Sequence, residues 1–83
     1  MGEALESQKE FARAAEIYEK LAQESGPRVA RGELYYAAAH AWEDAGNLAK
    51  ARPLYERVAT EFADTPSAGD AEIALGQIQA QGR

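Results

Sequence analysis

Apolar side chains recur along this chain of 83 residues at steps of three and four, a spacing that places them on one face of an α-helix. The first stripe joins Phe11, Ala14, Ala15, Tyr18, Leu21 and Ala22. A later stripe joins Leu48, Ala51, Leu54, Tyr55, Val58, Ala59 and Phe62, and one between them joins Leu34, Tyr35, Ala38, Ala39, Ala41, Trp42 and Ala45. The pattern predicts helices over about 2–8, 10–24, 29–45, 48–63 and 67–80, and therefore an all-α fold.

Residues with strong turn and cap preferences lie between these stripes. Gly46 fits the left-handed position that often follows a helix, and Asn47 can cap the helix that comes next. Thr65 and Ser67 are alternative caps for the last helix. Such short connections predict antiparallel helix neighbours.

The chain matches itself when it is shifted by 37 residues, without a gap. The matched pairs are Phe11 with Leu48, Arg13 with Lys50, Ala14 with Ala51, Tyr18 with Tyr55, Lys20 with Arg57, Leu21 with Val58, and Gly32 with Gly69. Chance similarity between alanine-rich helices is the alternative, but it accounts poorly for a matched tyrosine and a matched glycine. A period in this range is typical of stacked helical units, none of which buries its apolar face alone.

The second unit resembles the tetratricopeptide repeat, a helix–turn–helix family, at Tyr35, Ala38, Ala39, Trp42, Gly46, Ala51, Tyr55, Val58 and Pro66. It departs from the family pattern at Ala39, where glycine is usual, at Val58, where alanine is usual, and at Pro66, which comes three residues late. The first unit keeps Gly2, Leu5, Ala14, Tyr18, Leu21 and Pro27, with Lys9 in place of the turn glycine. A third unit begins with Leu75 and Gly76.

The resemblance implies about two stacked repeats and a C-terminal capping helix, a fragment of a right-handed α-solenoid. The single domain would cover 1–83, with a partial first repeat at 1–28, a second repeat at 29–65 and the capping helix at 66–83. The long spacing and the segment "TPSAGDAEIALG" resemble the bacterial periplasmic type of repeat, seen in the Tol-Pal accessory protein and the outer-membrane-assembly lipoprotein. This subgroup implies a periplasmic location, which the remaining residues leave open.

Composition narrows the classes of function. The net charge of −5 disfavours nucleic acid and anionic membranes, and the absence of cysteine excludes disulfides and thiolate-bound metal. No apolar run is long enough for membrane insertion. His40 is the only histidine, and a lone histidine among alanines is more often structural or exposed than catalytic. We therefore expect a non-enzyme with no cofactor and no metal site.

The tetratricopeptide resemblance also implies a binding face. In this family the first helix of each unit lines a concave surface, which here gives Glu33, Tyr36, His40, Glu43, Asp44, Ile73 and Gln77, together with Asp70 and the partial first repeat's Glu3, Glu6 and Ser7. Such a groove is acidic, so we expect a scaffold that binds a protein or peptide segment with basic residues. The alternative is that these residues are only the solvated face of a short array.

A second function class rests on the start of the chain. If its first helix is truncated, the stripe of Phe11, Ala15 and Tyr18 is poorly covered, and an exposed apolar face favours association. The chain would then be a self-assembling structural element that forms a homo-oligomer, or a fragment whose partner is the rest of its own chain.

Overall fold

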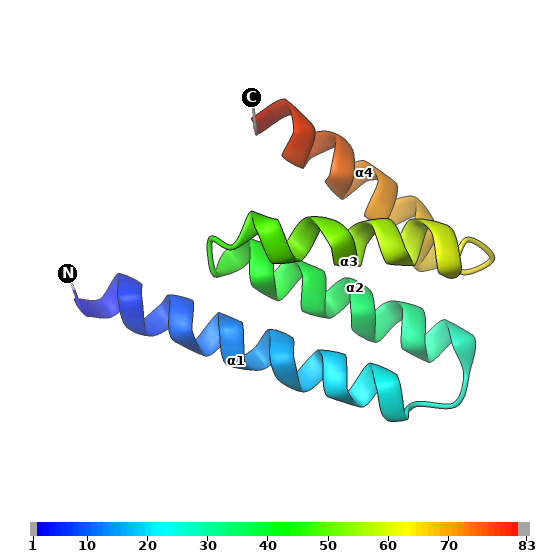
Figure 1. Ribbon diagram of the computed structural model, residues 1–83, viewed down its shortest axis with the longest axis horizontal. Coiled ribbons are helices and arrows are strands. Elements are labelled where there is room, and N and C mark those ends of the chain that lie inside the picture. The colour runs from blue at the N-terminus through cyan, green and yellow to red at the C-terminus, as the bar shows by residue number, and fades with distance from the viewer. Residues whose placement is uncertain (1, 82–83) are drawn as a thin grey trace.

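The computed structural model describes residues 2–81, with side chains for residues 9–80, and this part of the chain forms four helices. They are α1 (Gly2–Glu24), α2 (Arg28–Asp44), α3 (Leu48–Glu61) and α4 (Pro66–Gln81). Each helix packs against the next one along the chain, and α2 also contacts α4 (Figure 1). The predicted all-α class is confirmed.

The N-terminal helix corrects the predicted boundaries. The sequence pattern predicts one helix at 2–8 and another at 10–24, whereas α1 runs without a break from Gly2 to Glu24. The predicted turn at Lys9 came from alignment with the repeat. Locally, Gln8, Lys9 and Glu10 are good helix formers, and no glycine or proline lies between Glu3 and Glu24. Local propensity therefore continues the helix across this position.

The α2–α3 turn follows the sequence prediction closely. Gly46 has φ of 83°, a left-handed conformation that suits glycine. The N–H of Asn47 donates to Trp42 O and that of Gly46 to Glu43 O, both at 2.9 Å, the bonding pattern of a Schellman motif. The side chain of Asn47 then accepts from the N–H of Lys50 at 3.2 Å and caps α3.

The start of α4 distinguishes between the two predicted caps, Thr65 and Ser67. Ser67 lies inside α4, which begins at Pro66, and is therefore not the cap. Thr65 precedes the helix, and its buried hydroxyl donates to Phe62 O at 2.7 Å. The same turn lies close to Gly32 of α2. A Cβ added to this glycine would be only 3.1 Å from Thr65 Oγ1. Arg28 fastens the start of α2 to this turn by an ion pair with Asp64 at 2.8 Å.

The core lies between the helices and is built on small residues. Tyr35, Tyr55, Val58 and Ile78 are its largest fully buried side chains. The rest of the core cluster comprises Ala15, Ala22, Ala39, Ala41, Trp42, Ala51, Phe62, Ala71 and Ala74. Trp42 is 4% exposed, and its indole Nε1 donates to Glu19 Oε2 on α1 at 2.8 Å. Trp42 therefore lies in the core between α1 and α2, as its place in the apolar stripe predicts.

The molecule is flat, with extents of 42 × 31 × 15 Å. Among the described residues α1 contacts only α2, and α4 contacts α3 and α2. The two helices therefore form opposite edges of the structure, as Figure 1 shows, and each keeps one face without a helical neighbour. These edges and the grooves beside them contain the functional residues considered next.

Candidate functional site

Helix α2 presents polar and aromatic side chains on the face opposite to its buried stripe. Tyr36 and His40 are four residues apart and lie on the same side of the helix, with ring centroids 6.3 Å apart. The buried residues Tyr35, Ala39 and Trp42 hold the other side of α2 in the core. Tyr36 and His40 are consequently fixed on a rigid element, and each lines two pockets.

The first of these, which we call the acidic pocket, lies between α2 and α4 with α3 beneath. Its lining residues are Tyr36, His40, Glu43, Tyr55, Asp70, Ile73, Ala74 and Gln77. They include two carboxylates and no lysine or arginine. The volume is about 220 Å³, below the roughly 300–1,000 Å³ of small-molecule sites, so the pocket suits a single inserted side chain.

The hydroxyl of Tyr55 anchors the base of the acidic pocket. Tyr55 is 0% exposed, and its hydroxyl donates to Glu43 Oε1 at 2.7 Å. Its ring meets that of Tyr36 edge-on, with centroids 5.7 Å apart. Burial, followed by the hydrogen bond to Glu43, raises the pKa of Tyr55 well above its ordinary value. Tyr55 is therefore a neutral donor that holds the Glu43 carboxylate in place.

The potential in the acidic pocket is negative. The pKa of Tyr36 is raised, first by burial and then by the nearby charges of Asp70 and Glu43, which disfavour a phenolate. On the far side of Tyr36, His40 Nδ1 lies 3.2 Å from Asp44 Oδ2. A cationic group entering the pocket would gain from these carboxylates.

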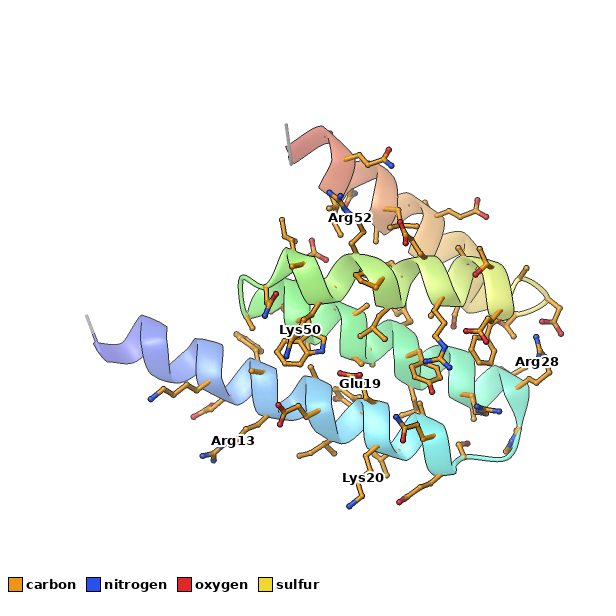
Figure 2. The ribbon with its side chains drawn as sticks, in the orientation of Figure 1. Arg13, Glu19, Lys20, Arg28, Lys50 and Arg52 are labelled. Carbon is orange, nitrogen blue, oxygen red and sulfur yellow. The ribbon has the colours of Figure 1, made fainter. Side chains whose placement is uncertain are left out.

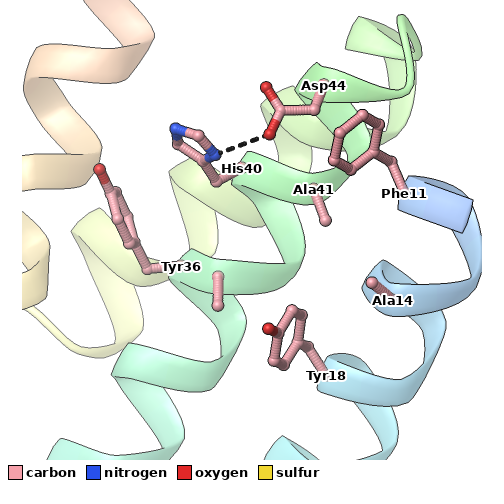
Figure 3. Close-up of a pocket in the computed structure, with 8 residues that line it drawn as sticks. Phe11, Ala14, Tyr18, Tyr36, His40, Ala41 and Asp44 are labelled. Atoms are coloured by element: carbon pink, nitrogen blue, oxygen red, sulfur yellow. Dashed lines mark ion pairs between the residues drawn. The ribbon is translucent and has the colours of Figure 1, made fainter. Parts of the chain in front are cut away.

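The second pocket, the α1–α2 pocket, is larger and apolar. It is lined by Phe11, Ala14, Tyr18, Tyr36, Ala37, His40, Ala41 and Asp44, and has a volume of about 500 Å³. Figure 3 shows Phe11, Ala14 and Tyr18 on α1 facing His40 and Ala41 on α2 across this space. Tyr18 remains 36% exposed and Phe11 40% exposed, so the pocket is open to solvent.

The structure gathers most of the predicted binding residues at these pockets. Tyr36, His40, Glu43, Ile73 and Gln77, with Asp70, line the acidic pocket, and Asp44 lines the α1–α2 pocket. Glu33 is exposed on α2 and lines neither one. The predicted contributions of Glu3, Glu6 and Ser7 concern side chains outside the described residues. The part played by Tyr55 in the acidic pocket was missed, because the sequence pattern marks this residue only as a member of an apolar stripe.

One predicted self-association residue is wrong. Ala15 is 0% exposed, since it packs directly against α2 with Ala22, one heptad later on the same face. Phe11 and Tyr18 lie beside this face, at the edge of the contact, and stay exposed as predicted. Only these two side chains of the predicted set are available at the surface.

The part of the chain that the structure describes has neither a metal-binding cluster nor a membrane-spanning helix. Residues 9–80 contain no group of three or more histidine, cysteine or acidic side chains placed to hold a metal ion. In the same part of the structure, no helix has the length and apolarity needed to cross a bilayer. Comparisons with protein families, with curated proteins and with solved structures found no match to this chain.

Proposed function

We propose that this chain is a tetratricopeptide-type interaction module that binds a peptide segment through a basic side chain in the acidic pocket. The observation that carries the proposal is the lining of that pocket. Glu43 and Asp70 face a space the size of one side chain, with the ring of Tyr36 as a wall and Ile73 at the rim. A lysine or arginine side chain has the charge and the apolar stem that fit such a lining.

The repeat interpretation rests on sequence and helix order together. The 37-residue match assigns α2 and α3 to one helix–turn–helix unit, with Gly46 and Asn47 at its turn. The same shift assigns α4 to the position of α2 in the next unit, which makes the acidic pocket a groove between two successive first helices. A solenoid fragment is therefore the architecture that we propose, and the resemblance to bacterial periplasmic repeats makes the periplasm its proposed location.

The binding proposal is tested by presenting the protein with labelled peptide libraries and measuring affinity by fluorescence anisotropy. We expect lysine- or arginine-containing peptides to bind, their acidic counterparts not to bind, and added salt to weaken the complex. Tyr36→Ala should weaken binding about tenfold, as expected for an aromatic side chain at the centre of a contact. Leu54→Ala is the matched control, because Leu54 is also partly buried but lies on α3 beside Trp42, away from the acidic pocket.

The proposal fails if basic and acidic peptides bind equally, or if Leu54→Ala weakens binding as much as Tyr36→Ala does. Replacing Asp70 by asparagine provides a second measurement, since it keeps the shape of an exposed side chain and removes its charge. The affinity for basic peptides should fall and its dependence on salt should become weaker.

A further inference from the structure

Helices α3 and α1 carry equivalent rows of side chains, which we call seams. The row on α3 is buried and is called the closed seam, and the row on α1 is partly exposed and is called the open seam. In α3 the seam residues are fully buried, and both α2 and α4 pack against this helix. They are Ala51, Tyr55 and Val58, and the residues 37 positions earlier are Ala14, Tyr18 and Leu21 on α1. In α1, Tyr18 is 36% exposed and Leu21 is 45% exposed. The packing of α2 on α3 therefore shows how another helix would pack on α1 to cover the open seam.

Two basic side chains lie along one edge of the closed seam. Lys50 Nζ lies 4.5 Å from the centre of the Trp42 ring, and Arg57 Cζ lies 4.6 Å from the centre of the Tyr35 ring. Both basic residues belong to α3 and both rings belong to α2, so the cations clamp the covering helix at two points one heptad apart.

The open seam carries the same two cations without the covering helix. Arg13 and Lys20 stand 37 residues before Lys50 and Arg57, and both are exposed. Figure 2 shows Arg13 and Lys20 projecting from the edge of α1 that faces away from α2. A helix that covers this seam would place one residue beside Arg13 and another beside Lys20, seven positions apart.

The chain itself contains a helix with matching residues. The 37-residue shift places α4 in the position of α2, with Glu72 replacing Tyr35 and Gln79 replacing Trp42. Between them Leu75 and Gly76 replace the paired small residues of α2. Glu72, Gly76 and Gln79 are exposed, and a Cβ added to Gly76 would meet nothing within 4 Å. This face of α4 is therefore free to approach another helix.

We propose that α4 of a second copy of this chain docks over the open seam of α1. Superposing the closed seam on the open one brings Glu72 of the second copy to Lys20 and its Gln79 to Arg13. Leu75 and Gly76 then lie over Tyr18 and Leu21. The charge on Glu72 would be unfavourable beside another carboxylate, but it complements a lysine.

The same arrangement uses the α1–α2 pocket. Ile73 is 64% exposed in this molecule and stands 37 residues after Tyr36, a residue that lines both pockets. In the docked pair, Ile73 of the second copy lies at the mouth of the α1–α2 pocket. Its burial there would remove apolar surface from water on both copies.

Docking of this kind joins two different surfaces, the α1 seam of one copy and α4 of the next. A dimer formed by such a contact still has one unused surface on each copy. Further copies can therefore add until the array closes into a ring or continues as a filament. It rests on the repeat and on the two edge helices, and does not depend on peptide binding in the acidic pocket.

Sedimentation equilibrium over a concentration series tests the proposal with two charge-reversal variants, Lys20→Glu and Glu72→Lys. We expect the average mass of the unmodified chain to rise above the 9.0 kDa of one copy, and beyond the mass of a dimer, as concentration increases. Each variant alone should associate at least about fivefold more weakly. An equimolar mixture of the two should recover association, because both contacts between unlike variants pair opposite charges.

Glu56→Lys is the matched control, since it makes the same change of charge as Glu72→Lys at an exposed residue of α3 that belongs to neither docking surface. It should associate as the unmodified chain does, and circular dichroism should show that all variants stay helical. The proposal is overturned by a mass of one copy at every concentration. It is also overturned if the single variants match the unmodified chain, or if the mixture is no stronger than its components.

Discussion

The 37-residue shift of the sequence matches Tyr18 with Tyr55, and the structure predicts that these two tyrosines differ greatly in their contribution to stability. Tyr55 is 0% exposed and hydrogen-bonded to Glu43, whereas Tyr18 is 36% exposed beside an open pocket. A fully buried aromatic side chain removes about 200 Å² from water, roughly 5 kcal/mol at about 25 cal/mol per Å². Tyr55→Ala should therefore cost about 4–5 kcal/mol, because it also leaves an enclosed cavity.

The cost of Tyr18→Ala should be much smaller. About two thirds of Tyr18 is buried, so the loss of this buried surface costs at most roughly 3 kcal/mol in the free energy of unfolding. Water can enter the open space in place of the ring, so no enclosed cavity forms and we expect about 2 kcal/mol. The expected difference between the two variants is then about 2–3 kcal/mol, a large fraction of the roughly 4–12 kcal/mol expected for 83 residues.

Urea unfolding followed by far-ultraviolet circular dichroism measures both values. Low protein concentration keeps self-association out of the result. If Tyr55→Ala is too unstable to give a folded baseline, the phenylalanine variants make the same comparison. Tyr55→Phe removes a hydrogen bond to a charged acceptor and should cost about 1–2 kcal/mol, whereas Tyr18→Phe should stay within about 0.5 kcal/mol. Equal losses at the two positions would refute the assignment of one closed and one open seam.

Three further changes test the core, the turn and the response to pH. Trp42→Ala should lower the free energy of unfolding by about 3–5 kcal/mol, since it leaves a cavity in the core beside α1 and removes the hydrogen bond to Glu19. A thermal melt like that of the unmodified chain would contradict this. Asn47→Ala should cost about 1 kcal/mol through loss of the α3 cap, measured by urea unfolding, and Asn47→Asp should retain most of it. Because burial raises the pKa of Tyr55, the folded chain holds this proton above about pH 10 while the unfolded chain releases it. The free energy of unfolding should thus begin to fall near pH 10 and keep falling as the pH rises further, and it should fall less steeply in Tyr55→Phe; parallel profiles would contradict the assignment.

The parts of the fold that the sequence predicts well are those set by local residues. The end of α2 and the start of α3 follow from Gly46 and Asn47, whose conformational and capping preferences act over a few bonds. The break expected near Lys9 came from alignment with a repeat pattern, and local helix propensity won there. Of the two alternative caps of α4, Thr65 precedes the helix and Ser67 lies inside it, because Pro66 itself occupies the first helical position.

At the candidate site, the sequence predicts which residues take part better than it predicts how deeply each one is buried. The residues of the binding face were predicted from repeat position, and most of them do line the acidic pocket. What repeat position does not reveal is burial, because burial depends on whether a neighbouring helix is present. Tyr18 and Tyr55 match in sequence and differ in exposure for this reason. Ala15 was assigned to an exposed stripe, although the side of α1 that it occupies is the one facing α2.

Binding of a basic side chain between Glu43 and Asp70 is the central claim of this account. The most direct test is titration of the ¹⁵N-labelled protein with its best basic peptide, followed by the backbone amide shifts. We predict that the largest changes fall on α2 around Tyr36 and Glu43 and on α4 between Asp70 and Gln77, and that Asp70→Asn reduces them. Shifts concentrated on the outer face of α3, or shifts unchanged in Asp70→Asn, would contradict the claim.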